Sequence, residues 1–439
     1  MATEKQFQQY AFEIWGGIEC TLNRVRNHFF DQLELTGHYY RADDIERICS
    51  LGVKAMRYPV LWEAHEINEN EDVNWTWVER NLCQLRDNGV RPIAGLVHHG
   101  SGPAFTSLDD PEFPEKLARY ARKVAEKFPW IEYYTPVNEP LTTARFSGLY
   151  GFWYPHEQDD RAFLRMLLNQ VKGIILSMRE IRKINPKAKL VQTEDLGKTY
   201  SDTVLKYQAD FENERRWLAY DLLLGKVDKN HGLWKYLLWA GITEKELLFF
   251  RENACVPDIC GFNYYVTSER YLDSNIEQYP SHLHGGNHRH RYVDTEAVRV
   301  RESGHGGLTV LLQEAWNRLR LPLAITEVFL SCTPDEQVRW AYQVCETAAD
   351  AKENGIDLRA VTFWALLGES GWNTLVTSLD GEYESGAFDV RSGTPAETLI
   401  AEYIRSITGN GSFASDILQE HGWWQSENRF HSQDVCIEK

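Results

Sequence analysis

Short apolar runs alternate with longer amphipathic stretches along this chain of 439 residues. The short runs are rich in β-branched and aromatic residues, which is typical of buried parallel strands. The longer stretches repeat apolar positions at helical spacing, and several end at Gly or Pro. The strands predicted in this way are Phe12–Glu19, Val53–Val60, Arg91–His98, Ile131–Asn138, Lys189–Glu194, Asp258–Tyr265, Pro322–Glu327 and Leu358–Leu366.

Predicted helices fill each gap between these strands, and one more follows the last strand. They are Asp43–Leu51, Trp75–Asn88, Glu112–Phe128, Asp160–Ile184, Tyr207–Leu224, Leu308–Arg320, Pro334–Asn354 and Pro395–Ile407. This alternation is the pattern of an α/β protein with a (β/α)8 TIM barrel. We therefore predict one barrel over residues 1–408 and a polar tail, 409–439, that packs on the barrel or is partly disordered.

Composition and charge narrow the classes of partner. Hydrophobic residues make up 43% of the chain and charged residues 25%, as expected for a globular protein with a large core. The net charge of −17 repels phosphate backbones and anionic lipids, so we expect neither nucleic acid nor membrane as a partner. The start of the chain lacks a secretory signal, and the eight cysteines form no CxxC pair. These features predict a cytoplasmic protein with reduced thiols, and they leave a homo-oligomer open.

Polar side chains gather at the predicted strand ends, where barrels of this kind form their sites. They are His98, Asn138, Glu139, Glu194, Asn263, Tyr265, Glu327 and Trp364. Glu139 and Glu327 stand directly at the exits of the fourth and seventh strands. Two carboxyl groups about 5–5.5 Å apart are what retaining glycoside hydrolysis requires. One attacks the sugar, and the other donates a proton and later removes one from water. The aromatic content of 13% suits sugar binding, although a large aromatic core explains it as well.

Five motifs occur in one order from about Trp15 to Trp372: MRYPVLW, TPVNEP, NYY, ITE and FWALLGESGW. Together they resemble the family 1 glycoside hydrolases, the β-glucosidase-like retaining enzymes with a clan A barrel. The resemblance implies that Glu139 is the acid/base and Glu327 the nucleophile. It also implies a small-molecule glycoside as substrate and no cofactor, because retaining hydrolysis needs no metal.

The resemblance implies further roles around the sugar. Asn138 matches the side chain that holds the 2-hydroxyl, and Arg57 and Tyr265 match the groups beside the nucleophile. A guanidinium and a phenol at that place are expected to keep Glu327 ionised. His98 matches a sugar-binding histidine, and Trp364 matches the platform beneath the sugar ring.

The departures from the family pattern concern the outer end of the sugar. Asn23 stands in the place of a Gln that grips the outer hydroxyls, and the motif around the nucleophile reads Glu-Val-Phe instead of Glu-Asn-Gly. Aligning Trp372 with the family's last sugar-binding Trp puts Gly371 where the family has Glu. Loss of that acceptor weakens binding of glucose-like sugars by roughly a few kcal/mol. A 6-deoxy or otherwise modified sugar fits better, unless Glu369 or Glu194 takes over the contact.

A closer likeness lies in the phrases WGGIECTLNRV and HGWWQSENRF. They look like the glycosidase-like half of bacterial two-part proteins whose second half resembles dTDP-4-dehydrorhamnose reductase. The sequence contains no G-x-G-x-x-G nucleotide fingerprint. The likeness favours a deoxysugar context. Glu19, within the first phrase, belongs either to the site or to the surface.

Residues 279–307 are rich in His, Arg and Gly and are predicted to form a long loop. His282, His284, His288 and His290 lie within it, but no Cys or carboxylate joins them at a usual zinc spacing, so we expect no metal. A loop over the entrance to the site remains open. A role for Arg289 and Arg291 in meeting an anionic leaving group also remains open.

Two functions follow from the sequence. The first is a retaining glycoside hydrolase, with transglycosylation left open, that acts on a β-glycoside of a non-standard or deoxy sugar. The second is a catalytically silent barrel that binds a sugar or a nucleotide-sugar. The altered motif around Glu327 and the Gly at position 371 motivate the second.

Overall fold

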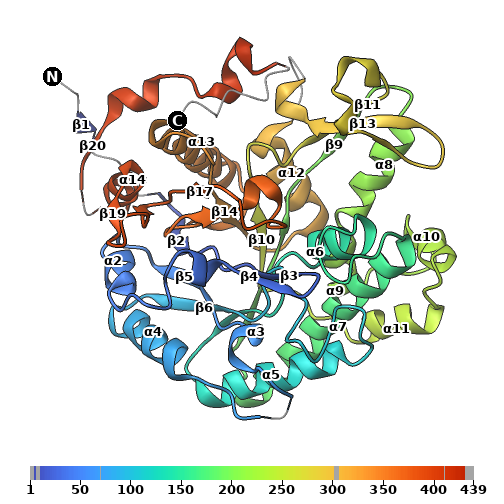
Figure 1. Ribbon diagram of the computed structural model, residues 1–439, viewed down its shortest axis with the longest axis horizontal. Coiled ribbons are helices and arrows are strands. Elements are labelled where there is room, and N and C mark those ends of the chain that lie inside the picture. The colour runs from blue at the N-terminus through green and yellow to red at the C-terminus, as the bar shows by residue number, and fades with distance from the viewer. Residues whose placement is uncertain (1–3, 6–9, 70, 301–305, 410, 431–439) are drawn as a thin grey trace.

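Eight parallel strands close into a barrel, and helices wrap around its outside (Figure 1). The computed structural model describes residues 4–5, 10–69, 71–300, 306–409 and 411–430. The barrel strands are β2 (Glu13–Gly17), β5 (Ala55–Pro59), β6 (Arg91–Gly95), β7 (Tyr133–Thr135), β8 (Lys189–Asp195), β10 (Ile259–Asn263), β14 (Leu323–Val328) and β15 (Leu358–Phe363). Their order around the barrel follows the chain, and each overlaps one predicted strand. The predicted (β/α)8 TIM barrel is therefore confirmed.

The barrel interior is apolar at one level and polar above it. A small buried cluster takes one side chain from the first half or middle of seven strands, and the eighth strand adds the partly buried Tyr133. The cluster consists of Trp15, Ala55, Ile93, Val191, Ile259, Ala324 and Ala360. Nearer the C-terminal ends of the strands, the buried side chains include Arg57, Asn263 and Glu327. The apolar layer thus closes the lower part of the barrel, and polar groups fill its mouth.

The outer helices bury their apolar faces on the strands, and this layer forms the main core. They are α2 (Asp44–Cys49), α4 (Thr76–Asp87), α5 (Phe113–Lys127), α7 (Asp160–Ile184), α8 (Lys206–Arg215), α9 (Leu218–Leu223), α12 (Gly307–Leu319), α13 (Pro334–Glu353) and α14 (Leu399–Thr408). Each of the eight predicted helices overlaps at least one of them. Within the described ranges, no helix is both long enough and apolar enough to cross a bilayer.

One of the predicted helices consists of two separate helices in the structure. The stretch Tyr207–Leu224 forms α8 and α9, which are separated by Arg216 and Trp217. Every residue of α9 is buried, whereas α8 is mostly polar and contacts the short strand β9 (Thr199–Ser201). The two halves face different surroundings, so a single straight helix does not satisfy both.

The predicted long loop 279–307 is also corrected. Strands β12 (His284–Gly286) and β13 (Arg291–Glu296) pair as an antiparallel hairpin. β13 also pairs with β11 (Arg270–Asp273), and β11 pairs with β9, which completes a four-stranded sheet. Figure 1 shows β9, β11 and β13 of this sheet at the upper right, outside the barrel. Residues 301–305 lie outside the described part of the chain.

Short elements complete the fold. They are β1 (Glu4–Lys5), β3 (Leu22–Val25), β4 (His28–Asp31), α1 (Gln32–Leu35), α3 (Trp62–His65), α6 (Pro140–Ala144), η1 (Arg145–Leu149), α10 (Trp234–Trp239), α11 (Glu244–Glu252), β16 (Glu369–Ser370), β17 (Tyr383–Glu384), β18 (Phe388–Asp389), β19 (Ala396–Glu397) and β20 (Phe413–Ala414). In the C-terminal segment, β20 pairs with β1. Trp424 is buried against Trp340 and donates to Gln343 Oε1 over 2.7 Å. Residues 410 and 431–439 of the predicted tail lie outside the described residues.

Candidate active site

Glu139 stands just beyond β7 in a left-handed backbone conformation, with φ 44° and ψ 60°. Its N–H donates to Thr193 O over 3.2 Å, and its carbonyl accepts from Thr143 N over 2.9 Å. Pro140 follows and starts α6. A non-glycine residue in this conformation costs roughly 1–3 kcal/mol, and such strain is common at functional sites. The two backbone contacts hold Glu139 at the barrel mouth, where its carboxyl lies next to Asn263.

Glu327, the second carboxylate, lies within β14 and has two strong partners. Arg57 Nη1 donates to its Oε1 over 2.7 Å, and Tyr265 OH donates to its Oε2 over 2.5 Å. Arg57 also donates from the same nitrogen to Thr326 O over 2.8 Å. The side chain of Glu327 is 4% exposed. The predicted guanidinium and phenol therefore flank this carboxylate.

Asn263 and Asn138 connect the two acids. Asn263 Nδ2 donates to Glu139 Oε1 over 2.6 Å, and Asn263 pairs in register with Glu327 across β10 and β14. Asn138 Oδ1 accepts from Arg57 Nη2 and from Thr193 Oγ1, each over 2.7 Å. Asn263 Nδ2 also donates to Asn138 Oδ1, over 3.4 Å. A continuous set of hydrogen bonds thus runs from the Glu139 carboxyl to the Glu327 carboxyl through two neutral amides and the Arg57 cation.

Two aromatic rings and one further acid line the same mouth. The rings of His98 and Trp364 stack with centroids 5.2 Å apart, and Arg57 Cζ lies 4.4 Å from the centre of the Trp364 ring. Trp364 Nε1 donates to Glu19 Oε2 over 2.9 Å. Glu19 is buried and orients the tryptophan. It belongs to the surroundings of the site, and the surface interpretation of this residue is wrong.

Sequence reasoning missed His99, which also belongs to the site. Its Nε2, like Nε2 of His98, lies 3.3 Å from Asn138 Nδ2. Its Nδ1 lies 3.0 Å from Thr143 Oγ1, and its ring meets Trp372 edge-on at 5.6 Å. The doublet of histidines at the end of one strand was the available signal, because a second polar residue beyond a strand end also reaches the mouth.

Asn23, which was predicted at the outer end of the sugar, and Gln32, which was not predicted, are both engaged with the segment 370–376. Asn23 Nδ2 donates to Val376 O over 3.1 Å. Gln32 exchanges two hydrogen bonds with the backbone of Ser370, over 2.5 and 3.0 Å. Gly371 has φ +79°, so a Glu at this position requires a strained backbone. Asn23 Oδ1 and Trp372 Nε1 are buried without a hydrogen-bond partner among the described residues.

Glu369 and Glu194, the two proposed substitutes for the missing Glu, are both buried. Glu369 accepts a long hydrogen bond of 3.4 Å from Ser331 Oγ, and its pKa is raised by burial and then by Glu19. Glu194 Oε1 accepts from Leu141 N over 2.9 Å, and burial followed by the field of Glu139 raises its pKa. Glu194 therefore sits against the start of α6, and Glu369 sits on the side of Glu19.

The two central carboxyls have raised pKa values. Burial, followed by the negative field of Glu327, raises the pKa of Glu139 to about 8. Burial also raises the pKa of Glu327, to about 7, although Arg57 and Tyr265 act in the opposite direction. The expectation that these two neighbours alone keep Glu327 ionised is too simple, because burial outweighs them. The nucleophile candidate nevertheless remains the more acidic of the pair.

Glu369→Gln is expected to make the protein more stable at alkaline pH. The folded pKa of Glu369 is raised, so the folded state holds its proton longer than the unfolded chain does, and stability is lost as pH rises. The free energy of unfolding in urea should therefore fall less steeply between pH 5 and pH 8 in this variant than in the wild type. Exposed Glu277→Gln is the matched control, and equal slopes in all three proteins would contradict the assignment.

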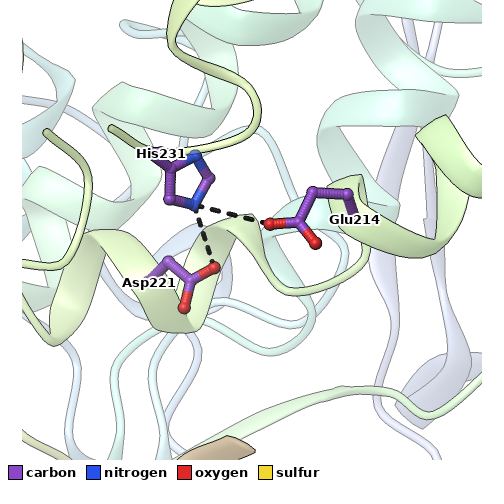
Figure 2. Close-up of side chains that lie close together, drawn as sticks. All are labelled: Glu214, Asp221 and His231. Atoms are coloured by element: carbon purple, nitrogen blue, oxygen red, sulfur yellow. Dashed lines mark hydrogen bonds and ion pairs between the residues drawn. The ribbon is translucent and has the colours of Figure 1, made fainter. Parts of the chain in front are cut away.

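One group of side chains among the described residues has the spacing of metal ligands, and it lies away from the barrel mouth. Figure 2 shows His231 between Asp221 and Glu214, at 3.1 and 3.9 Å. Arg318 Nη2 already pairs with both acids, at 2.6 and 3.1 Å. His231 Nδ1 accepts from Leu233 N, which directs the Nε2 proton toward Asp221. We assign this group to the packing of α8 and α9 against α12. The four histidines of the His-rich segment are not part of it.

Comparison with known proteins supports the fold. No family model matches the chain. Beta-glucosidase A of Thermotoga maritima is 26% identical over 179 residues, which cover 39% of this chain and 40% of that protein. The match therefore spans less than half the length of this curated relative.

Solved structures match over most of the chain. The family 1 β-glucosidase of Thermotoga maritima superimposes with a TM-score of 0.71 at 17% identity, covering 93% of this chain and 99% of that one. The AHE enzyme of Alicyclobacillus herbarius gives a TM-score of 0.69 at 17% identity over 85% and 88% of the two chains. At these identities the likeness establishes a shared barrel fold.

Proposed function

We propose that this protein is a retaining β-glycosidase in which Glu327 is the nucleophile and Glu139 is the acid/base. The observation that carries the proposal is the unequal environment of two buried carboxyls at one barrel mouth. Glu327 is held by a cation and a phenol, whereas Glu139 is held by a neutral amide and has the higher pKa. One acid is thereby favoured as the ionised partner and the other as the protonated partner.

The two steps follow from these environments. Glu327 attacks the anomeric carbon while Glu139 gives its proton to the leaving oxygen, which yields a glycosyl ester and a free alcohol. Glu139 then removes a proton from water, the resulting hydroxide adds to the same carbon, and the Glu327 carboxylate is released. Asn138, which is fixed by Arg57 and Thr193, is placed to hold the 2-hydroxyl through its amide. Trp364 offers its ring as the platform.

The sugar that we propose has fewer polar groups at its outer end than glucose. The amides of Asn23 and Gln32 are already used by the backbone of the Ser370–Val376 segment. Gly371 offers no side chain, and Val376 is buried. Asn23 Oδ1 and Trp372 Nε1, one acceptor and one donor, lack a hydrogen-bond partner among the described residues. A 6-deoxy or similarly modified sugar leaves the fewest buried hydroxyls unpaired in such surroundings.

The test is trapping with activated 2-fluoro glycosides, read by intact mass. The panel pairs each common aryl β-glycoside with its 6-deoxy counterpart. We expect a covalent adduct on Glu327 and faster trapping by the deoxy members, by about tenfold or more, since one unpaired polar group costs about 1–3 kcal/mol. Trapping that is faster with glucose would contradict the sugar assignment. Saturable sugar binding in calorimetry, without adduct or turnover across the panel, would instead select a silent binding barrel.

A further inference from the structure

Arg145 is a partly buried cation whose guanidinium forms no hydrogen bond and no ion pair among the described residues. It opens η1, a π-helical turn that follows α6 directly, at position 145 in the segment that begins with Glu139. Its Nε is buried and makes no hydrogen bond, and none of its nitrogens joins an ion pair in the described part of the chain. An unpaired buried guanidinium is costly, and π-helical turns are frequent at functional sites.

No acid among the described residues pairs directly with Arg145. Burial lowers the pKa of its guanidinium, but four neighbouring acidic groups raise it by more: Tyr150, Asp195, Glu212 and Glu194. Asp195 uses its oxygens to accept from Ser268 Oγ and Gly197 N, over 2.8 and 2.9 Å. Burial raises the pKa of both Asp195 and Glu194, which favours their neutral forms. Arg145 therefore keeps its charge, and no carboxylate among the described residues bonds to it directly.

A nearby arginine shows what a structural role looks like. Arg216 is also flanked by Asp195, but it pairs with Glu314 and donates to Gly197 O over 2.8 Å. Arg57 has three hydrogen bonds, as described above. The side chain of Arg145 makes no such contact among the described residues. Direct ion pairing or hydrogen bonding within the fold therefore does not account for its position.

The place of Arg145 in the reaction follows from the role of Glu139. An acid that protonates the leaving oxygen lies between the sugar and the aglycone, so groups beyond it border the aglycone. The field of Asp195 acts on both Glu139 and Arg145. Tyr150, which directly follows η1, is close enough to Tyr292 of β13 to raise the pKa of that phenol. The hairpin of the outer sheet therefore lies on the same side of the barrel as η1. The guanidinium thus belongs to the aglycone side of the site.

We propose that Arg145 binds an anionic group, a carboxylate or a phosphate, on the aglycone, and so determines specificity for the leaving group. The inference rests on the proposed glycosidase function and names its substrate class. Arg presents a planar fork that matches the oxygens of either anion. With a net charge of −17, the protein repels anions elsewhere on its surface, so a buried unpaired cation gives selectivity.

A matched pair of substrates tests the proposal in the whole protein. The leaving groups are 3-carboxy-4-nitrophenol and its 3-carboxamide, on whichever sugar the protein hydrolyses. We expect kcat/KM to favour the carboxylate by about tenfold or more, as a charged hydrogen bond contributes about 1.5–3 kcal/mol. Arg145→Gln should bring that ratio close to one, and Arg145→Lys should leave it intermediate. Arg86→Gln, at an exposed arginine of α4 that pairs with Asp87, is the control and should keep the ratio.

A second measurement does not depend on turnover. Calorimetry with 4-hydroxybenzoate, phenyl phosphate and neutral 4-hydroxybenzamide should show tighter binding of one or both anions, lost about tenfold in Arg145→Gln. The two anions distinguish carboxylate from phosphate. If neutral glycosides are hydrolysed but neither the ratio nor anion binding depends on Arg145, this inference is overturned and the glycosidase proposal stands. If Arg145 binds the anions but no glycoside is turned over, the glycosidase proposal is the one that fails.

Discussion

Glu327→Gln is expected to lower kcat for an activated aryl glycoside by about 10,000-fold or more, which corresponds to about 5.4 kcal/mol of lost transition-state stabilisation. The amide cannot attack the anomeric carbon, while it keeps the shape of the side chain and can still contact Arg57 and Tyr265. Substrate binding should therefore change much less than turnover. The initial rate and the mass adduct with a 2-fluoro glycoside are measured together, and both should be lost.

Two further variants separate a nucleophile from a structural carboxylate. Glu277→Gln removes a charge at an exposed position and should leave the rate unchanged. Glu327→Gly opens space beside the anomeric carbon, so added azide should restore turnover and yield a glycosyl azide of inverted configuration. A Glu327→Gln protein that keeps a tenth of the wild-type rate would rule out Glu327 as the nucleophile.

The barrel could be predicted because its signal is local and repeated. Each strand is a short apolar run, and the partner of each strand is its neighbour in the sequence. The hairpin of β12 and β13 carried no such signal, because its residues are mostly polar and β13 pairs with β11, outside the barrel. The break between α8 and α9 was equally invisible, since it depends on the different surroundings of the two halves, which the sequence does not give.

The candidate site was predictable where the proposed chemistry fixes the residue type. Carboxyls at strand exits, and the motifs around them, pointed to Glu139 and Glu327, and the structure brings Arg57 and Tyr265 to the second of these. The engagement of Asn23 with Val376 could not be foreseen, because the two residues are 353 positions apart and their contact depends on how a loop folds. The raised pKa of Glu327 could not be predicted either. The sequence indicates which residues neighbour a carboxyl, but it does not show how deeply that carboxyl is buried.

The pH dependence of kcat/KM is expected to be a bell with its maximum near neutral to slightly alkaline pH. Glu327 must be ionised to attack, so the rate rises as pH passes its pKa of about 7. Glu139 must be protonated to assist the leaving group, so the rate falls as pH passes its pKa of about 8. Both limbs lie well above the ordinary glutamate value of 4.5, because burial disfavours the charged forms. The two limbs belong to the pair, since the acids interact.

Glu139→Gln tells which acid controls the alkaline limb. With a 2,4-dinitrophenyl leaving group, which needs little protonation, kcat/KM should remain measurable and should stay high above pH 8. The acid limb should move by less than about half a pH unit, because the glutamine imitates the neutral form of Glu139 that is present on that side of the bell. Glu194→Gln is the discriminating control, since Glu194 is a second buried acid with a raised pKa beside Glu139. An alkaline limb that persists in Glu139→Gln and disappears in Glu194→Gln would transfer the proton-donor role to Glu194. Loss of that limb in Glu139→Gln alone would place the proton on the acid that borders the leaving group, as the double displacement requires.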